Sequence, residues 1–190
     1  MFRDTGGLVP RDRFIAAMRR VASSVTVVTT DGPAGRHGAT VSAFCSVSAD
    51  PPTVLVCLNA ETRIARVVGE NARFCVNILP ETRPEIADRF AGRHDGWIGD
   101  RFSGVACHGA PGSAPQIDGA TVFSCTVQQM VPSGTHLIAI GLVREVLDAQ
   151  ARPLAWREGG YHRVVPREGN DLAAPHPATT GAARPRGVCQ

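Results

Sequence analysis

Apolar and polar residues alternate along most of this chain with the period of β-strands, and only three stretches carry a helical period. Apolar residues recur three and four positions apart in 10–23, 61–71 and 83–92, which predicts helices there. In the first of these, the recurring residues are Phe14, Ala17, Met18 and Val21. The β-branched and alternating segments predict strands at 24–30, 37–49, 53–59, 73–80, 120–132 and 136–148, and a last short pair within 153–165.

Short turns join most of these strands, and the sequence lacks the regular alternation of strand and helix that builds a parallel sheet. We therefore predict a mainly β fold, a barrel or sandwich with flanking helices. The continuous apolar run 53–59 predicts a strand buried on both faces. Residues 93–119 are rich in glycine and predict irregular structure. After Pro166 the composition turns to Pro, Ala and Gly, so we expect one domain over 1–165 and a disordered tail over 166–190.

The charge pattern and the cysteines narrow the possible settings. The formal net charge of the 190 residues is +3, and the basic residues are scattered, which does not favour a nucleic-acid partner. The six cysteines form no C-x-x-C pair and four lie in apolar strands, so we expect free thiols and no metal site. No stretch is apolar enough for a membrane span or a secretion signal. A reducing, cytoplasmic location is the expectation, with no membrane partner.

The segment HGATVSAFCSVSADPPTVLVCLN, residues 37–59, carries the most unusual pattern. Read as a strand, its first half places small hydroxyls and one aromatic ring on one face and ordinary core residues on the other. No charged residue occurs from 39 to 49. The polar face is either exposed to solvent or a wall for a flat ring with polar edges. The polar face holds Thr40, Ser42, Phe44, Ser46 and Ser48, and the core face Ala39, Val41, Ala43, Cys45 and Val47.

Three further segments hold candidates for ligand binding, each with a simpler structural alternative. Asn59 and Thr62 lie where a strand gives way to a helix, with Arg63 and Arg66 nearby, so they either bind an anion or cap the helix. His136 begins an apolar strand and is either structural or functional. Tyr161 follows two glycines, which permit close approach of a ligand or a tight hairpin.

Five segments, taken together and in order, resemble the short-chain flavin reductases. They are FIAAMRRVASSVTVVTT, the segment 37–59, RFCVNIL, GTHLIAIGLV and PLAWREGGYHRV, and the resemblance runs from about residue 13 to 165. Members of that family are the reductase partners of two-component flavin monooxygenases, such as those acting on 4-hydroxyphenylacetate and phenol. The resemblance implies an FMN-binding split β-barrel, usually a homodimer. It also implies an NAD(P)H:flavin oxidoreductase that supplies reduced FMN or FAD to a separate monooxygenase.

The resemblance also implies roles for individual residues. His136 matches the family histidine that meets the nicotinamide, and Tyr161 matches the aromatic residue of the closing segment. Two positions depart from the family pattern: Thr135 stands where an Asp is common, and Glu61 where a small hydroxyl is common. A carboxylate at 61 would repel a phosphate unless it points outward. The flavin-binding residues that the resemblance implies are Ala39, Thr40, Val41, Ser42, Ala43, Ser46, Ser48, Cys57, Leu58, Asn59, Thr62, Asn71 and Phe74.

Two other functions remain open from the sequence. One is a flavin-binding module that stores or senses flavin on the same barrel without turnover. The other, more distant, is an enzyme similar to the pyridoxamine-phosphate oxidases, which are also split barrels. The sequence does not decide between FMN and FAD, or between NADH and NADPH.

Overall fold

The computed structural model describes residues 7–93, 95–97, 99–110 and 112–167. Its helices are α1 (Arg11–Met18), α2 (Arg63–Asn71) and α3 (Pro84–Phe90). Its strands are β1 (Ser23–Ser24), β2 (Thr26–Thr30), β3 (His37–Val41), β4 (Phe44–Ala49), β5 (Pro52–Asn59), β6 (Arg73–Ile78), β7 (Cys107–His108), β8 (Gln116–Ile117), β9 (Thr121–Ser133), β10 (His136–Leu147), β11 (Leu154–Arg157) and β12 (Gly160–Arg163).

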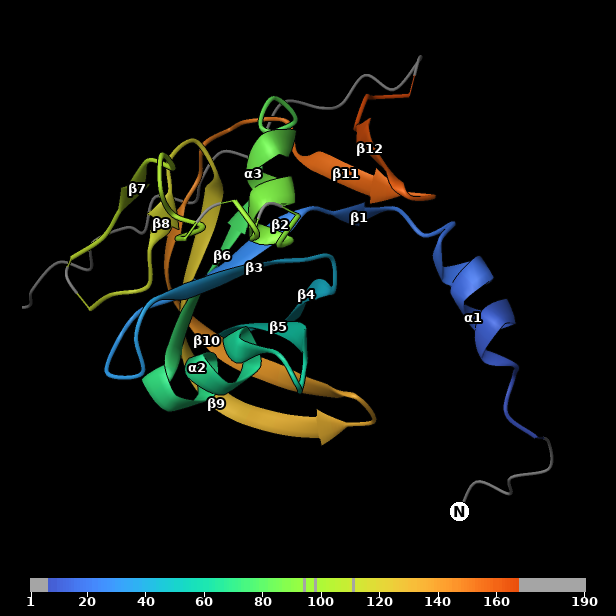
Figure 1. Ribbon diagram of the computed structural model, residues 1–190, viewed down its shortest axis with the longest axis horizontal. Coiled ribbons are helices and arrows are strands. Elements are labelled where there is room, and N and C mark those ends of the chain that lie inside the picture. Colours follow the sequence, from blue (N-terminus) through green and yellow to red (C-terminus); the bar gives the residue numbers. More distant parts are fainter. Residues whose placement is uncertain (1–6, 94, 98, 111, 168–190) are drawn as a thin grey trace, which may run out of the picture.

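The main sheet has seven antiparallel strands in the order β3-β2-β6-β9-β10-β5-β4. Strands β3 and β4 follow each other in the chain, yet they form the two opposite edges of this sheet. Only Ser42 and Ala43 connect them, so the sheet must curve until its edges approach each other (Figure 1). The amide of Cys57 donates a hydrogen bond of 3.0 Å to the carbonyl of Ala43 at this junction. The predicted mainly β split barrel is confirmed.

The junction corrects the prediction of one continuous strand over 37–49. Ala39 and Val41 pack against the core inside the barrel, but beyond the break it is Phe44 that does so. Two residues of irregular backbone therefore reverse the parity, and Phe44 does not share a face with Thr40. Three residues predicted to lie in the core are exposed instead: Ala43, Cys45 and Val47.

Two apolar cores lie on the two sides of the curved sheet. The core inside the barrel is built by alternate residues of the strands and by α2, and includes Val28, Val56, Leu58, Phe74 and Val76. The outer core lies beneath α3 and the segment that follows it, and includes Val27, Leu79, Ile86, Phe90 and Ile117. Neighbouring residues of one strand thus serve different cores, as the alternation of a strand requires.

The helices α2 and α3 approach opposite sides of β3. Ile64 of α2 is buried in the inner core. On the other side, Gly38 lets α3 come close, because a Cβ there would lie 2.6 Å from a ring carbon of Phe90. The hydroxyl of Thr40 donates a hydrogen bond of 2.7 Å to the carbonyl of Ala87 in α3. Strand β3 is thereby held between two helices while its outer edge pairs with no strand among the described residues.

Two apolar surfaces lack a cover from the described part of the chain. Helix α1 forms as predicted, but it has no buried residue, and Phe14 and Met18 are 54% and 49% exposed. In Figure 1 it stands apart from the sheet. Strand β5 was expected to be buried on both faces, which is wrong: its inner residues are buried, whereas Leu55 and Cys57 on the outer face are half-buried. Nothing within the described residues packs over that outer face.

The remaining elements agree with the sequence pattern. The long hairpin β9–β10 and the short hairpin β11–β12 form where they were predicted, and α2 and α3 begin and end within a few residues of the expected positions. The described residues of the segment 93–119 are largely irregular, and the small pair β7–β8 is the only strand pair among them. Of the predicted tail, residues 168–190 lie outside the described residues. No described helix is both long and apolar enough to cross a membrane.

The packing at Gly141 of β10 gives a test of this fold. A Cβ at this position would lie 2.5 Å from the ring of Phe74 and 2.9 Å from the Cβ of Cys125. We expect Gly141→Ala to lower the free energy of unfolding by about 1–3 kcal/mol through overpacking. Urea unfolding followed by circular dichroism measures the change, and Phe74→Leu should partly restore stability in the double variant.

The matched control is Gly69→Ala in α2, where the nearest atom to the new Cβ is the methyl carbon of Met130 at 4.0 Å. This change should be neutral or stabilising, because alanine favours a helix over glycine. Equal destabilisation by both substitutions would contradict the described packing of Gly141 against Phe74 and Cys125.

Candidate active site

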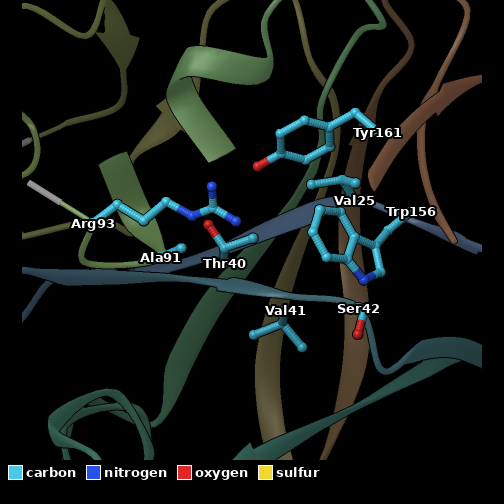
Figure 2. Close-up of a pocket in the computed structure, with 8 residues that line it drawn as sticks. All are labelled: Val25, Thr40, Val41, Ser42, Ala91, Arg93, Trp156 and Tyr161. Atoms are coloured by element: carbon cyan, nitrogen blue, oxygen red, sulfur yellow. The ribbon is translucent and has the colours of Figure 1, made fainter. Parts of the chain in front are cut away.

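A cavity of about 170 Å³ opens where β3 ends and the barrel splits. Figure 2 shows the rings of Trp156 and Tyr161 over the backbone of Thr40–Ser42, with the Arg93 guanidinium entering the same space toward Thr40. Arg93 is the single charged residue in the lining. The full lining is Val25, Thr40, Val41, Ser42, Ala91, Arg93, Trp156 and Tyr161.

The short hairpin β11–β12 supplies the aromatic side of this cavity. Trp156 and Tyr161 are direct cross-strand partners, and their rings meet edge to face with centroids 5.1 Å apart. The Tyr161 hydroxyl donates a hydrogen bond of 2.7 Å to Asp88 of α3, and the same carboxylate pairs with Arg93 at 3.3 Å. Burial of the phenol, together with its bond to the Asp88 carboxylate, raises the pKa of Tyr161 to about 12. Tyr161 is therefore a neutral hydrogen-bond donor at physiological pH.

A second cavity, of about 390 Å³, continues from the first along β3. The two share Thr40 and Ala91, so they form one trough that runs from the aromatic pair toward the beginning of α2. Thr62 is the N-cap residue of α2, but its side chain does not bond to the amides of the first turn. Its hydroxyl instead donates a hydrogen bond of 2.6 Å to the carbonyl of Asn59. The amides of the first turn thus remain available to an anion in the cavity. The lining is His37, Ala39, Thr40, Thr62, Arg63, Ile64, Phe90, Ala91 and Arg101.

His136 lies at the same end of the sheet as the Asn59–Thr62 turn. It is the register partner of Asn59, and the carbonyl of Thr135 accepts a hydrogen bond of 3.0 Å from the amide of Ala60. The hydroxyl of Thr135 lies 2.9 Å from Nδ1 of the imidazole. A neutral hydroxyl therefore occupies the position beside His136 where the resemblance leads us to expect a carboxylate.

The structure brings together only part of the residue set implied by the resemblance. Ala39, Thr40, Val41, Ser42, Thr62 and Tyr161 line the two cavities. Ala43, Cys57, Leu58 and Asn59 lie beside them on the junction and on β5. There Ala43 and Cys57 meet through their backbones, and the side chain of Leu58 is buried in the inner core. None of these four residues lines either cavity, so their part in flavin binding stays a prediction.

Four implied residues lie elsewhere or serve the fold. Ser46 and Ser48 belong to β4, at the other edge of the sheet, and line neither cavity; the Ser48 hydroxyl bonds to the backbone of Asp50. Asn71 uses its amide group to hold the turn before β3, with bonds to Ala34, Gly35 and Thr30. Phe74 is completely buried in the inner core. We assign Asn71 and Phe74 structural roles.

Other residues of the site escaped the sequence analysis. Trp156 lies in the quoted segment PLAWREGGYHRV, and pairing the predicted hairpin about its turn would have placed it opposite Tyr161. Arg93 and Arg101 belong to the irregular segment, where no periodicity shows which way a side chain points. Glu61 lines neither cavity and is exposed, so its carboxylate does not occupy the trough.

Comparison with known proteins gives a consistent answer. Residues 18–165 match the family model described as flavin reductase like domain. The chain belongs to this family. Among curated flavin reductases, the FMN reductase (NADH) RutF of Cronobacter turicensis is 38% identical over 153 residues, which are 80% of this chain and 91% of that protein. The predicted membership of the flavin reductases is confirmed.

Solved flavin reductase structures share the fold. BorF, the flavin reductase component of a bacterial two-component tryptophan halogenase, aligns with a TM-score of 0.74 and 27% identity, covering 83% of this chain and 100% of BorF. The NADH:FAD oxidoreductase SgcE6 of Streptomyces globisporus C-1027, in complex with NAD and FAD fragments, aligns with a TM-score of 0.76 and 26% identity. That alignment covers 86% of this flavin reductase and 99% of SgcE6.

Because Tyr161 is the single tyrosine of the sequence, its ionisation can be followed directly. We expect the tyrosinate absorbance at 295 nm to rise near pH 12 instead of near the ordinary value of 10. The folded state holds the proton more tightly than the unfolded chain. This contribution to stability is therefore complete below pH 10 and disappears between pH 10 and 12.

Asp88→Asn removes the carboxylate that accepts the hydrogen bond of the Tyr161 hydroxyl. It should move the midpoint of the Tyr161 titration back toward pH 10. The paired control is Asp118→Asn, an exposed carboxylate beside His108, which should leave the Tyr161 midpoint unchanged. A wild-type midpoint near 10, or no effect of Asp88→Asn, would contradict the described contact.

Proposed function

We propose that the protein is an NADH-dependent flavin reductase, which transfers a hydride from reduced nicotinamide to FMN or FAD and releases the reduced flavin. The observation that carries this proposal is the trough along β3. Its inner part is an almost uncharged wall of strand backbone facing an aromatic pair, and its outer part ends at a helix N-terminus. This combination suits a flat ring joined to a phosphate.

Strand β3 and the β3–β4 junction supply the wall for the ring. The outer edge of β3 pairs with no strand among the described residues. Apart from the Gly38 carbonyl, which accepts a bond of 3.1 Å from Arg101, its backbone groups can bond the polar edge of an isoalloxazine. The Thr40 hydroxyl is fixed by its bond to Ala87, which leaves its oxygen as an acceptor toward the cavity. Bound flavin supplies the redox chemistry, and strand amides near its pyrimidine edge stabilise the charge of the reduced ring.

The beginning of α2 supplies the phosphate end of the site. The free amides of its first turn and the guanidinium of Arg63 favour binding of an anion in this part of the trough. Arg66, which the sequence also placed nearby, instead pairs with Glu70 on the exposed side of the helix at 3.1 Å. Arg63 is thus the arginine of this helix that we assign to the phosphate.

His136 is the proposed catalytic residue that meets the nicotinamide. It lies next to the Asn59–Thr62 turn, at the phosphate end of the trough, and lines neither cavity, so this role rests on the resemblance and requires a nicotinamide that enters from that end. The Thr135 hydroxyl fixes the imidazole through Nδ1 without adding a charge. The role of the protein in hydride transfer is then to hold two rings in contact, which is catalysis by proximity.

The curated relatives named FMN reductase (NADH) support FMN and NADH as the first substrates to test, and FAD and NADPH remain within the proposal. We further propose that reduced flavin passes to a separate flavin-dependent monooxygenase, which the role of BorF in a two-component system supports. The five cysteines in the described residues are free thiols, which supports a reducing, cytoplasmic location. A flavin-storing or flavin-sensing protein on the same barrel is the alternative function.

A homodimer is also part of the proposal. The outer face of β4, β5 and β10 carries a contiguous set of apolar side chains that the cross-strand register places together. None of the described residues covers this face, and α1 also presents an uncovered apolar side. A second copy of the chain would bury both. The outer-face residues are Cys45, Leu55, Cys57, Ile138 and Ile140.

The activity test is NADH oxidation at 340 nm with FMN, FAD or riboflavin added to the purified protein. We expect flavin-dependent oxidation of NADH with sequential initial-velocity patterns. His136→Ala should raise the KM for NADH about tenfold, equivalent to about 1.4 kcal/mol, with a much smaller change for the flavin. His108→Ala, at an exposed histidine on β7, is the control and should behave as wild type.

Tight, stoichiometric flavin with negligible NADH oxidation would instead identify the storage or sensor function. An unchanged KM for NADH in His136→Ala would remove that residue from the nicotinamide site.

The oligomeric state has its own test. We expect sedimentation velocity to give twice the chain mass of 20.1 kDa, and Ile140→Glu to give the monomer, since it places a charge in an apolar interface. Val165→Glu, at a valine that is 68% exposed beyond β12, is the control. A monomeric wild-type protein would contradict the proposed homodimer.

A further inference from the structure

A third cavity, of about 540 Å³, extends the trough beyond the proposed phosphate site. It shares His37, Arg63 and Arg101 with the second cavity, so the two are continuous. Its outer wall comes from the turn before β3 and from the segment after α3. We call this third cavity the basic cleft, and its lining is Arg36, His37, Arg63, Asp95, Gly99, Asp100, Arg101 and Phe102.

The charges of the basic cleft favour an anionic ligand. Arg36 pairs with Asp100 at 2.6 Å and Arg101 pairs with Asp95, whereas Arg63 forms no ion pair with any described residue. The cleft therefore holds one more cation than anion. Burial, and then the nearby Arg101 and Arg63, lower the pKa of His37 to about 4, so this imidazole is neutral at pH 7 and leaves the balance unchanged.

A flat surface lies at the far end of the cleft from the ring site. The Arg36 guanidinium stacks over the Phe102 ring, 4.6 Å from its centroid, and Phe102 meets Phe90 edge to face at 4.9 Å. Packing on Phe102 holds the Arg36 side chain in place while 47% of it stays exposed. A planar guanidinium fixed in this way can stack on a purine and bond a phosphate.

We propose that the basic cleft binds an adenosine 5′-phosphate group, the part of FAD that FMN lacks. This inference rests on the proposed function. With the flavin ring on the β3 wall and its first phosphate at the beginning of α2, a second phosphate falls next to Arg63 and Arg101. The adenine then lies at Arg36. NADH carries the same chemical group and is the other possible occupant.

The two carboxylates of the cleft set the strength of this binding. A phosphate that enters competes with Asp95 and Asp100 for the guanidiniums that they hold. Removing the carboxylate that holds Arg36 should therefore strengthen binding of the adenylate group, and removing the guanidinium should weaken it. Both changes break the same ion pair, so a purely structural role of that pair would give the same response to each. Opposite responses therefore indicate a ligand site.

The experiment compares Arg36→Ala, Asp100→Asn and wild type in steady-state assays with FMN and with FAD, and with NADH varied. We expect Arg36→Ala to raise the KM for FAD about tenfold while the KM for FMN changes less than twofold. Asp100→Asn should lower the KM for FAD. Arg66→Ala, which removes an equal charge from the exposed side of α2, is the control and should alter neither flavin selectively.

Calorimetric titration with ADP, without flavin, gives a readout that does not depend on turnover. ADP should bind wild type and bind Arg36→Ala more weakly. If Arg36→Ala raises the KM for NADH and not the KM for FAD, the cleft still binds an adenylate group, but the group belongs to NADH.

Parallel effects of Arg36→Ala and Asp100→Asn, or equal changes for FMN and FAD without loss of ADP binding, would overturn the inference while leaving the reductase intact. Absence of NADH oxidation with every flavin would defeat the proposed function itself.

Discussion

The architecture depends on one constraint: two strands joined by two residues form the opposite edges of one sheet. The seven strands can satisfy it only by wrapping until β3 and β4 meet at Ser42 and Ala43. At this meeting point the ladder does not close: the facing edges of β3 and β4 pair with no described strand, and the bond from Cys57 to Ala43 only extends the β4–β5 pairing by one residue. The gap leaves backbone groups of the edge strands facing a cavity. In a closed barrel these groups would form hydrogen bonds between neighbouring strands.

Helices and hairpins on both sides of β3 convert this gap into a site. Helix α2 fills the barrel with its apolar face and presents its N-terminus at the cavity. On the other side α3 holds Thr40 through Ala87 and Tyr161 through Asp88, so one short helix fixes both the strand wall and the aromatic side of the first cavity. The close approach of α3 requires Gly38, where any side chain would collide with Phe90.

The trough also separates its charges along its length. The end at Trp156 and Tyr161 is nearly uncharged, which suits the proposed release of reduced flavin, and the far end carries arginines held by carboxylates and by Phe102. Arginine provides every side-chain cation of the chain apart from histidine. Its planar fork can exchange a carboxylate partner for a phosphate without leaving the cleft. A phosphate-bearing ligand can thus be held firmly at one end and loosely at the other.

The sequence by itself determined the elements and the family. Periodicity located both hairpins and the helices, because local alternation follows directly from which side chains must be buried. The motif at 39–42, with Thr62 and Tyr161, supplied residues that line the two cavities, and these lie on or next to regular elements. Tertiary structure alone decided the rest. Nothing local to 37–49 shows that the strand breaks, because the break follows from the curvature of all seven strands.

The same reason explains the residues that were misplaced or missed. Asn71 and Phe74 belong to segments that resemble the flavin reductases, but their side chains point away from the cavities. Asn71 bonds to the turn before β3, and Phe74 is buried in the inner core. Arg36, Arg93 and Arg101 come from turns and irregular chain, where direction depends on what packs against them. Sequence therefore fixes what an alternating segment buries, and only the assembled sheet determines which distant side chains share a cavity.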